Sequence, residues 1–143
     1  LKILAYDPYI NEINDKEIDA KLSNLNEIYE KSDIISIHLP LTDETKNMIN
    51  KSSFSKMKNN PIIINTSRGS IINENDLIDA YHEKIISGFA LDVFENEPIE
   101  SKFYNKIVPG MNCILTPHIS GVTTESNIRV RDFIVKKIIN FFN

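Results

Sequence analysis

Residues 61–69, Pro-Ile-Ile-Ile-Asn-Thr-Ser-Arg-Gly, decide the fold, because a short apolar run is followed at once by polar residues. The three isoleucines predict a buried strand, and Arg68 lies just beyond its carboxyl end. Two later segments repeat this arrangement: Leu91-Asp92-Val93-Phe94-Glu95-Asn96-Glu97-Pro98 and Leu115-Thr116-Pro117-His118. Ligands bind at the carboxyl ends of strands in open α/β sheets, so we expect Arg68, Glu97 and His118 to converge there.

Strands and helices alternate along the rest of the chain. Apolar runs predict strands at residues 2–6, 34–37, 62–64, 89–91 and 113–115. Amphipathic segments predict helices at residues 23–31, 50–57, 73–87 and 124–142. Ser23 or Asn24 would cap the first helix and Asn73 the third, and Gly88 follows the end of the third. This alternation is typical of an α/β fold with a doubly wound parallel sheet, covered by helices on both faces.

The composition limits the classes of function. The chain has 143 residues, enough for one domain with a core of its own. A net charge of -4, a pI near 5.4 and the lack of a basic run argue against nucleic-acid binding. The single cysteine, Cys113, allows no internal disulfide, so we expect a reducing, cytoplasmic location. No apolar run approaches the roughly 20 residues of a membrane span, and no cluster has metal-ligand spacing, so we expect neither a membrane nor a metal partner.

An Arg, a Glu and a His at one sheet edge suit redox chemistry on a 2-oxo or 2-hydroxy acid. Arg68 can bind the carboxylate through two charge-assisted hydrogen bonds, each worth roughly 1.5–3 kcal/mol. Gly69 would free the backbone to turn beside it. Hydride transfer to the carbonyl leaves an alkoxide that needs a proton, and His118 can supply it. Glu97 beside His118 would favour the imidazolium and fix its orientation.

Each of these residues also has a simpler explanation when it is taken alone. Arg68 could form a surface ion pair, Glu97 could be a solvated side chain in an acidic stretch, and His118 could close a turn. All three follow predicted strands, however, and this favours a joint catalytic role.

Motifs in a fixed order along most of the chain resemble those of the D-isomer-specific 2-hydroxyacid dehydrogenases. They are Asp7 after the first strand, His38-Leu39-Pro40-Leu41-Thr42 with Thr45, Ile64-Asn65-Thr66-Ser67-Arg68-Gly69, Leu91-Asp92-Val93-Phe94 with Glu97-Pro98, and Thr116-Pro117-His118. The resemblance implies an NAD-dependent oxidoreductase with a Rossmann-type cofactor domain, a small 2-hydroxy or 2-oxo acid as substrate, and a homodimer.

Within the family, residues 38–45 and 115–124 are most similar to members that act on 3-phosphoglycerate in the first step of serine biosynthesis. Glycerate, lactate and glyoxylate enzymes share the Arg, Glu and His and remain open alternatives. Formate dehydrogenases carry a glutamine where Glu97 stands, which disfavours them. A relative that keeps the fold and senses NAD without turnover is a further alternative.

The resemblance also implies a cofactor site. Asp7 would bind the adenosine ribose hydroxyls of NAD, and Asp92 would hold the nicotinamide end. The remaining residues that would line the cofactor, several of them through the backbone, are Leu39, Pro40, Thr66, Ser67, Arg68, His118, Ser120 and Gly121. From the residues alone, Asp7 could also be a turn former ahead of Pro8, and His38 is better explained as structural than as catalytic.

One family motif has no counterpart in this sequence: the Gly-x-Gly-x-x-Gly turn that binds the pyrophosphate. The glycines of the chain do not form it: Gly69, Gly88, Gly110 and Gly121. We therefore expect residues 1–121 to be a dinucleotide-binding domain without its first strand and glycine loop, and the absent strand to belong in the middle of the sheet. Residues 122–143 would form a helix that returns toward a substrate domain outside this sequence.

Overall fold

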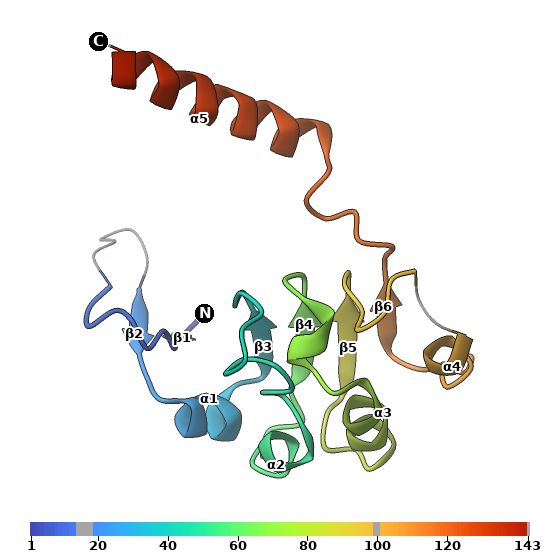
Figure 1. Cartoon of the computed structure of the whole chain (residues 1–143). Helices are drawn as coiled ribbons and strands as arrows, with labels where there is room; N and C mark the ends of the chain where they lie inside the picture. Colours follow the sequence, from blue (N-terminus) through green and yellow to red (C-terminus); the bar gives the residue numbers. More distant parts are fainter. Residues whose placement is uncertain (14–18, 99–100, 143) are drawn as a thin grey trace.

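The computed structural model describes residues 1–13, 19–98 and 101–142 (Figure 1). The elements along the chain are β1 (Ile3–Ala5), β2 (Ala20–Leu22), α1 (Leu25–Lys31), β3 (Ile34–Ile37), α2 (Lys51–Phe54), β4 (Ile62–Asn65), the 3-10 helix η1 (Gly69–Ile71), α3 (Glu74–His82), β5 (Gly88–Leu91), α4 (Ser101–Tyr104), β6 (Cys113–Leu115) and α5 (Thr124–Phe142). All of the predicted strands are present, close to their expected bounds.

All strand pairs in the described part of the chain are parallel. β3, β4, β5 and β6 form one sheet in that order, and β1 and β2 form a second, smaller sheet. In Figure 1 the small sheet stands beside β3, and β1 is the nearer of its two strands. Among the described residues, β1 and β3 each have one edge without a strand partner. The parallel α/β architecture confirms the predicted fold class.

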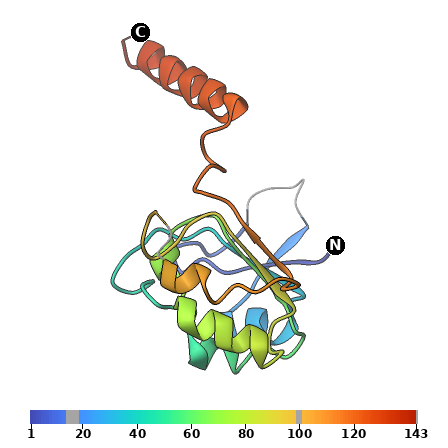
Figure 2. The same ribbon diagram turned by 90° about the vertical axis from the view of Figure 1, so that its right-hand side faces the viewer.

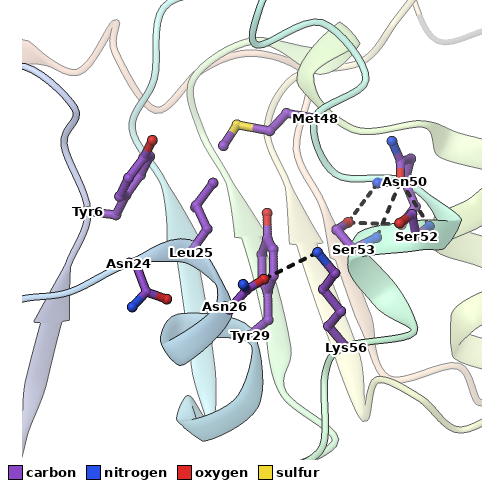
Figure 3. A pocket seen from close by; sticks show the side chains of 10 residues that line it. All are labelled: Tyr6, Asn24, Leu25, Asn26, Tyr29, Met48, Asn50, Ser52, Ser53 and Lys56. Carbon is purple, nitrogen blue, oxygen red and sulfur yellow. Dashed lines mark hydrogen bonds between the residues drawn. The ribbon is translucent and has the colours of Figure 1, made fainter.

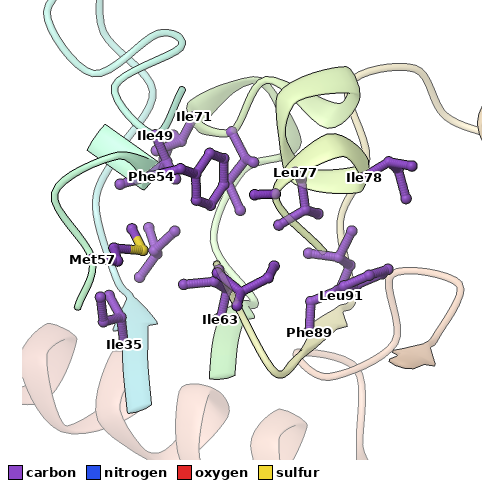
Figure 4. Packing of buried hydrophobic residues seen from close by; sticks show 14 of the residues in the cluster. Ile35, Ile49, Phe54, Met57, Ile63, Ile71, Leu77, Ile78, Phe89 and Leu91 are labelled. Carbon is purple, nitrogen blue, oxygen red and sulfur yellow. The ribbon is translucent and has the colours of Figure 1, made fainter. Parts of the chain in front are cut away.

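The core lies between the larger sheet and helices α1, α2 and α3, which run along one face of it (Figures 1 and 2). Ile35 and Ile37 of β3 point to this face. Ile63 of β4, Leu77 of α3 and Phe54 of α2 are almost completely buried there (Figure 4). Burying one such side chain contributes about 1.5–3 kcal/mol, so this packing fixes the strands and the segments that follow them.

The opposite face of the sheet is open within the described residues. Ile34 is 55 % exposed and Ile114 is 66 % exposed, because no helix packs against them. The prediction of helices on both faces is therefore met on one face only. The reason is that an apolar strand shows that both of its faces suit burial, but it does not show which element covers each face.

The third predicted helix is longer than the one observed. α3 starts after Asn73, whose side chain accepts hydrogen bonds from two N–H groups of the first turn, as expected for a cap. The helix ends at His82 and not at Ser87, because Lys84 adopts a left-handed φ of 59° and the N–H groups of this turn fold back onto the last carbonyls. Gly88, expected to follow the helix, is instead the first residue of β5.

Shorter elements account for the other differences. β2, η1 and α4 have no counterpart among the predicted elements, because each has only three or four residues and shows no clear period. α2 is also shorter than the predicted segment 50–57. α1 begins after Asn24, whose side chain accepts the N–H of Glu27, so Asn24 and not Ser23 is the cap.

α5 extends away from the rest of the chain (Figures 1 and 2). Its bounds agree with the predicted helix 124–142, and none of its described side chains is buried. Phe133, Ile134 and Ile138 are about half exposed or more. α5 is thus an amphipathic helix whose apolar side chains have no packing partner among the described residues.

Candidate active site

The three segments with the predicted catalytic residues follow neighbouring strands. Arg68 comes after β4, Glu97 after β5 and His118 after β6, and these strands are adjacent and parallel. Their carboxyl ends therefore lie at one edge of the sheet, which the sequence predicts as the ligand-binding edge.

Glu97 and His118 form a direct pair at this edge. His118 Nδ1 lies 2.7 Å from Glu97 Oε2, and both side chains keep between one third and one half of their surface exposed. Glu97 Oε1 accepts the backbone N–H of Phe94 at 3.0 Å. The hydrogen bond with His118 and then that from Phe94 hold the pKa of Glu97 below its usual value. The carboxylate stays ionised near neutral pH and fixes the orientation of the imidazole.

The backbone at His118 is tightly constrained. Its φ of 55° lies in the left-handed region, which a non-glycine residue adopts only when its surroundings hold it there. Its N–H donates to the carbonyl of Thr116 at 3.0 Å. This short turn brings the imidazole back toward the segment that carries Glu97.

Asp92, the residue after β5, holds both sides of this turn. Its carboxylate is buried and accepts hydrogen bonds from Thr116 Oγ1 (2.6 Å), Ile119 N (2.9 Å), and the N and Oγ of Ser120 (3.0 and 2.5 Å). Burial alone would raise the pKa of Asp92, but the hydrogen bonds from Ser120, Thr116 and Ile119 outweigh it and lower the pKa to about 2. Asp92 is thus an ionised buried anchor on either side of His118. The predicted contact of Asp92 with the nicotinamide stays a prediction.

Arg68 lies in a loop that Asn65 organises. The guanidinium is exposed, and its Nη1 donates to the carbonyl of Ser67 at 2.6 Å. Asn65 is buried at the end of β4 and bonds to both Ser67 and Arg68. Thr66, between them, is exposed. Geometry therefore joins Glu97 to His118 directly, while the head group of Arg68 is held by its own loop.

Gly69 is required for a different reason from the one that the sequence suggests. A Cβ on Gly69 would lie 1.9 Å from the carbonyl carbon of Phe94 and 2.5 Å from the nitrogen of Glu95. The absence of a side chain therefore allows the Arg68 loop to pack directly on the backbone before Glu97. Close approach of two loops, and not a glycine-only turn, explains this residue.

The remaining predicted cofactor residues lie at the ends of β1, β3 and β6. Asp7 is exposed after β1, and its Oδ1 accepts the N–H of Tyr9 at 2.8 Å, so the turn-forming interpretation of Asp7 is correct whatever else it binds. Leu39 is partly buried and Pro40 is exposed after β3; Ser120 and Gly121 are exposed beyond β6. Ser36 Oγ and His38 Nε2 lie 2.8 Å apart, which fits the structural role expected for His38.

A hollow of about 500 Å³ lies away from this pair, between the small sheet and helices α1 and α2 (Figure 3). Tyr6, Tyr29 and Met48 supply its apolar lining, and Asn26 and Lys56 are joined across it by a hydrogen bond of 3.2 Å. It borders the space between the unpaired edges of β1 and β3. The sequence analysis above contains no signal for it, because its lining comes from four separate segments.

Two other kinds of site are absent from the described part of the chain. No group of three or more His, Cys, Asp or Glu side chains there is arranged to hold a metal ion. None of the described helices has the length and apolar character needed to cross a membrane.

Comparisons with known proteins identify the family. The family model for the D-isomer specific 2-hydroxyacid dehydrogenase, NAD binding domain, matches residues 1–120. A hydroxypyruvate reductase of Blautia hydrogenotrophica is 40% identical over 141 residues, which cover 99% of this chain and 43% of the reductase. A D-3-phosphoglycerate dehydrogenase of Synechocystis sp. is 38% identical over 138 residues, which cover 96% of this chain and 24% of the dehydrogenase.

A solved structure agrees with these relatives. D-lactate dehydrogenase from Aquifex aeolicus, crystallised with NAD and lactic acid, matches with a TM-score of 0.78 and 35% identity, covering 97% of this chain and 45% of that one. The chain thus spans less than half the length of these relatives. Because the family model covers most of its residues, the chain belongs to the NAD-dependent D-isomer-specific 2-hydroxyacid dehydrogenases, within their NAD-binding domain.

Proposed function

We propose that the full-length protein interconverts a D-2-hydroxy acid and the corresponding 2-oxo acid at the sheet edge that carries Arg68, Glu97 and His118. The 2.7 Å contact between His118 Nδ1 and Glu97 Oε2 carries this proposal. It orients an imidazole at the ligand-binding edge of a parallel sheet and leaves Nε2 to exchange a proton with substrate. A solvated acidic residue and a simple turn residue would not need to meet in this way.

Arg68 is proposed to bind the substrate carboxylate. Its exposed guanidinium can offer two parallel N–H groups to a carboxylate, and a single internal bond to Ser67 holds it meanwhile. Since the carboxylate is bonded directly to the reacting carbon, fixing it also fixes the carbonyl. This accounts for a preference for 2-oxo acids over simple ketones.

His118 is proposed as the acid in reduction and the base in oxidation. Bound NAD supplies or accepts the hydride. In reduction, the imidazolium of His118 gives its Nε2 proton to the oxygen that becomes the hydroxyl; in oxidation, the neutral ring takes that proton back. Glu97, kept ionised by its contacts, stabilises the protonated ring through Nδ1. Asp92 keeps the turn around His118 in place.

The residues present fit part of the cofactor. Asp7 offers an exposed carboxylate at the end of β1, which suits the two ribose hydroxyls near the adenine. Exposed backbone at Pro40, Thr66, Ser120 and Gly121 lies along the same edge. The pyrophosphate needs a glycine loop that this sequence does not contain. We therefore propose that residues 1–121 supply the ribose and nicotinamide ends of the site.

The unpaired edges of β1 and β3 support a proposal about the rest of the domain. One further parallel strand between them would give six of the seven strands the order 3-2-1-4-5-6 of a dinucleotide fold, with β2 and β1 as the third and second strands. We propose that this strand and the glycine loop come from residues outside this sequence. We also propose that α5 packs on a substrate domain, because its apolar side chains are unpartnered here.

For the substrate, we propose 3-phosphohydroxypyruvate and 3-phosphoglycerate, with the reaction in serine biosynthesis, in a cytoplasmic homodimer. The similarity to a D-3-phosphoglycerate dehydrogenase supports this choice. The similarity to a hydroxypyruvate reductase favours a second candidate, the glycerate type. Both candidates are three-carbon 2-oxo acids with oxygen at the third carbon.

A substrate panel tests the proposal. The full-length protein would be assayed for NADH oxidation with 3-phosphohydroxypyruvate, hydroxypyruvate, pyruvate and glyoxylate. The highest kcat/KM is expected with 3-phosphohydroxypyruvate. Preference for hydroxypyruvate would select the glycerate type, and preference for pyruvate or glyoxylate would select those enzymes. NAD binding without turnover of any 2-oxo acid would contradict an enzymatic role and favour an NAD-sensing module.

A further inference from the structure

Asn65 is the most deeply buried polar side chain near the proposed site, with 0 % of its surface exposed. It is the last residue of β4. Its Oδ1 accepts the backbone N–H of Ser67 at 3.0 Å and the hydroxyl of Ser67 at 2.9 Å, and its Nδ2 donates to the carbonyl of Arg68 at 3.0 Å. A buried amide is costly unless it is bonded, so this side chain holds the loop in one conformation.

The bonds of Asn65 fix the residue that precedes the reacting edge. Ser67 and Arg68 are both tied to one rigid side chain on a central strand of the larger sheet. The carbonyl of Arg68 is held from the sheet, and the carbonyl of Ser67 holds the guanidinium in turn. Backbone and head group of Arg68 are therefore both positioned by the loop that Asn65 organises.

The same loop is packed against the segment that carries Glu97. Gly69 has no room for a Cβ, because the backbone of Phe94 and Glu95 fills that space. Phe94 donates its N–H to Glu97 Oε1, and Glu97 Oε2 contacts His118. A shift of the Arg68 loop would thus disturb the Glu97 segment by direct contact. The position of Arg68 relative to the His118–Glu97 pair depends on Asn65.

We propose that Asn65 is a positioning residue that sets the place of the Arg68 guanidinium for the substrate carboxylate. The proposal rests on the function proposed above for Arg68 and extends it to a residue that no sequence motif singles out for chemistry. Asn65 touches neither substrate nor cofactor in this role and acts through Arg68 alone. A purely structural asparagine would affect stability and leave carboxylate binding unchanged.

A double-mutant cycle separates the two roles. In the full-length protein, the Kd of oxamate, a 2-oxo acid analogue that cannot be reduced, is measured with saturating NADH for four forms: wild type, Asn65→Ala, Arg68→Ala and the double variant. We expect Asn65→Ala to weaken oxamate binding by about 10- to 100-fold and to change the Kd of NADH little. In the Arg68→Ala background, Asn65→Ala is expected to have no further effect on oxamate.

A matched control is present in the same chain. Asn50 caps α2 with similar bonds: Oδ1 accepts the N–H of Ser52 and of Ser53, and Nδ2 donates to the carbonyl of Asn47. Asn50→Ala is expected to lower the Tm as a lost cap does and to leave the Kd of oxamate unchanged. If Asn65→Ala fails to fold, Asn65→Asp replaces it, because Asp keeps the acceptor for Ser67 and loses the donor to Arg68.

The outcomes are distinct. A weaker oxamate affinity that disappears as an effect in the Arg68→Ala background supports the positioning role. A lower Tm with unchanged oxamate affinity, or effects of the two substitutions that add, overturns it and leaves the proposed function standing. An Arg68→Ala variant that binds oxamate as wild type does would overturn the carboxylate role of Arg68, and the role of Asn65 with it.

Discussion

Replacing Asp92 by asparagine removes the charge that organises the His118 turn. The carboxylate accepts four hydrogen bonds, two on each oxygen. An asparagine must place its NH2 group against one of these pairs, and each pair includes a backbone N–H, of Ile119 or of Ser120, that cannot accept a hydrogen bond. At least one buried donor is then left without a partner, whichever way the amide turns.

The magnitude follows from the pKa of Asp92. Folding lowers this pKa from 3.8 to about 2, and each unit is worth about 1.4 kcal/mol, so the ionised form contributes about 2 kcal/mol. An unpaired buried donor costs a further 1–3 kcal/mol or about that, and the two contributions overlap. We expect Asp92→Asn to lower the free energy of unfolding by about 2–4 kcal/mol at pH 7.

The pH dependence has a definite sign. Because the folded-state pKa is depressed, the stabilisation is complete above about pH 4 and is lost as the pH falls toward about 2. Urea unfolding of the full-length wild type and variant at pH 7 and at about pH 3 measures this, and the gap between them should narrow at the lower pH. Asp79→Asn, on the exposed side of α3, is the control and should change little. An Asp92→Asn variant within about 0.5 kcal/mol of wild type at pH 7 would refute the anchoring role.

Three further predictions concern the pair, the cofactor and the chain itself. Glu97→Gln should move the pH profile of 2-oxo acid reduction to lower pH, because the imidazolium of His118 loses its counter-charge; a profile of kcat against pH that does not move would show that Glu97 plays no part in the protonation of the donor. The full-length protein should prefer NAD over NADP in steady-state kinetics, since Asp7 accepts ribose hydroxyls and repels a 2′-phosphate, and equal turnover with both would remove Asp7 from this role. Residues 1–143 alone should bind NAD weakly in calorimetric titration, because the glycine loop is lacking and β1 and β3 have unpaired edges; tight binding would contradict the proposed missing strand.

The strands and the meeting of Glu97 with His118 could be predicted from the sequence for a physical reason. Apolar runs of three to five residues between turn-forming residues have few alternatives to a buried strand, and parallel strands align their carboxyl ends. Residues 94–97 and 116–118 therefore had to lie at one edge. The contact of Glu97 with His118 then follows from two short segments on neighbouring strands.

Other features depend on contacts that a local pattern does not contain. The end of α3 at His82 is set by the left-handed Lys84, a residue type that gives no warning of such a turn. Asp92 finds its partners 24 to 28 residues away, so its anchoring of Ser120 could not be predicted from spacing. Gly69 was expected to serve a turn, whereas the neighbouring loop decides its role.

Asn65 shows the limit most clearly. Within its motif it is an ordinary polar residue after a strand, where a surface position is the usual expectation. The structure buries it completely and satisfies both ends of its amide. Only the depth of the loop behind the strand distinguishes a positioning residue from a solvated one.

The effect of His118→Ala on turnover tests the proposed chemistry most directly. In the full-length protein this substitution removes the proton donor and leaves the cofactor edge in place, so kcat should fall by about 10²–10⁴ while the Kd of NADH stays nearly constant. His82→Ala, on the exposed end of α3, serves as the control and should keep wild-type kcat. A His118→Ala variant with kcat close to that of wild type would contradict the assignment of His118 as the acid and base of the reaction.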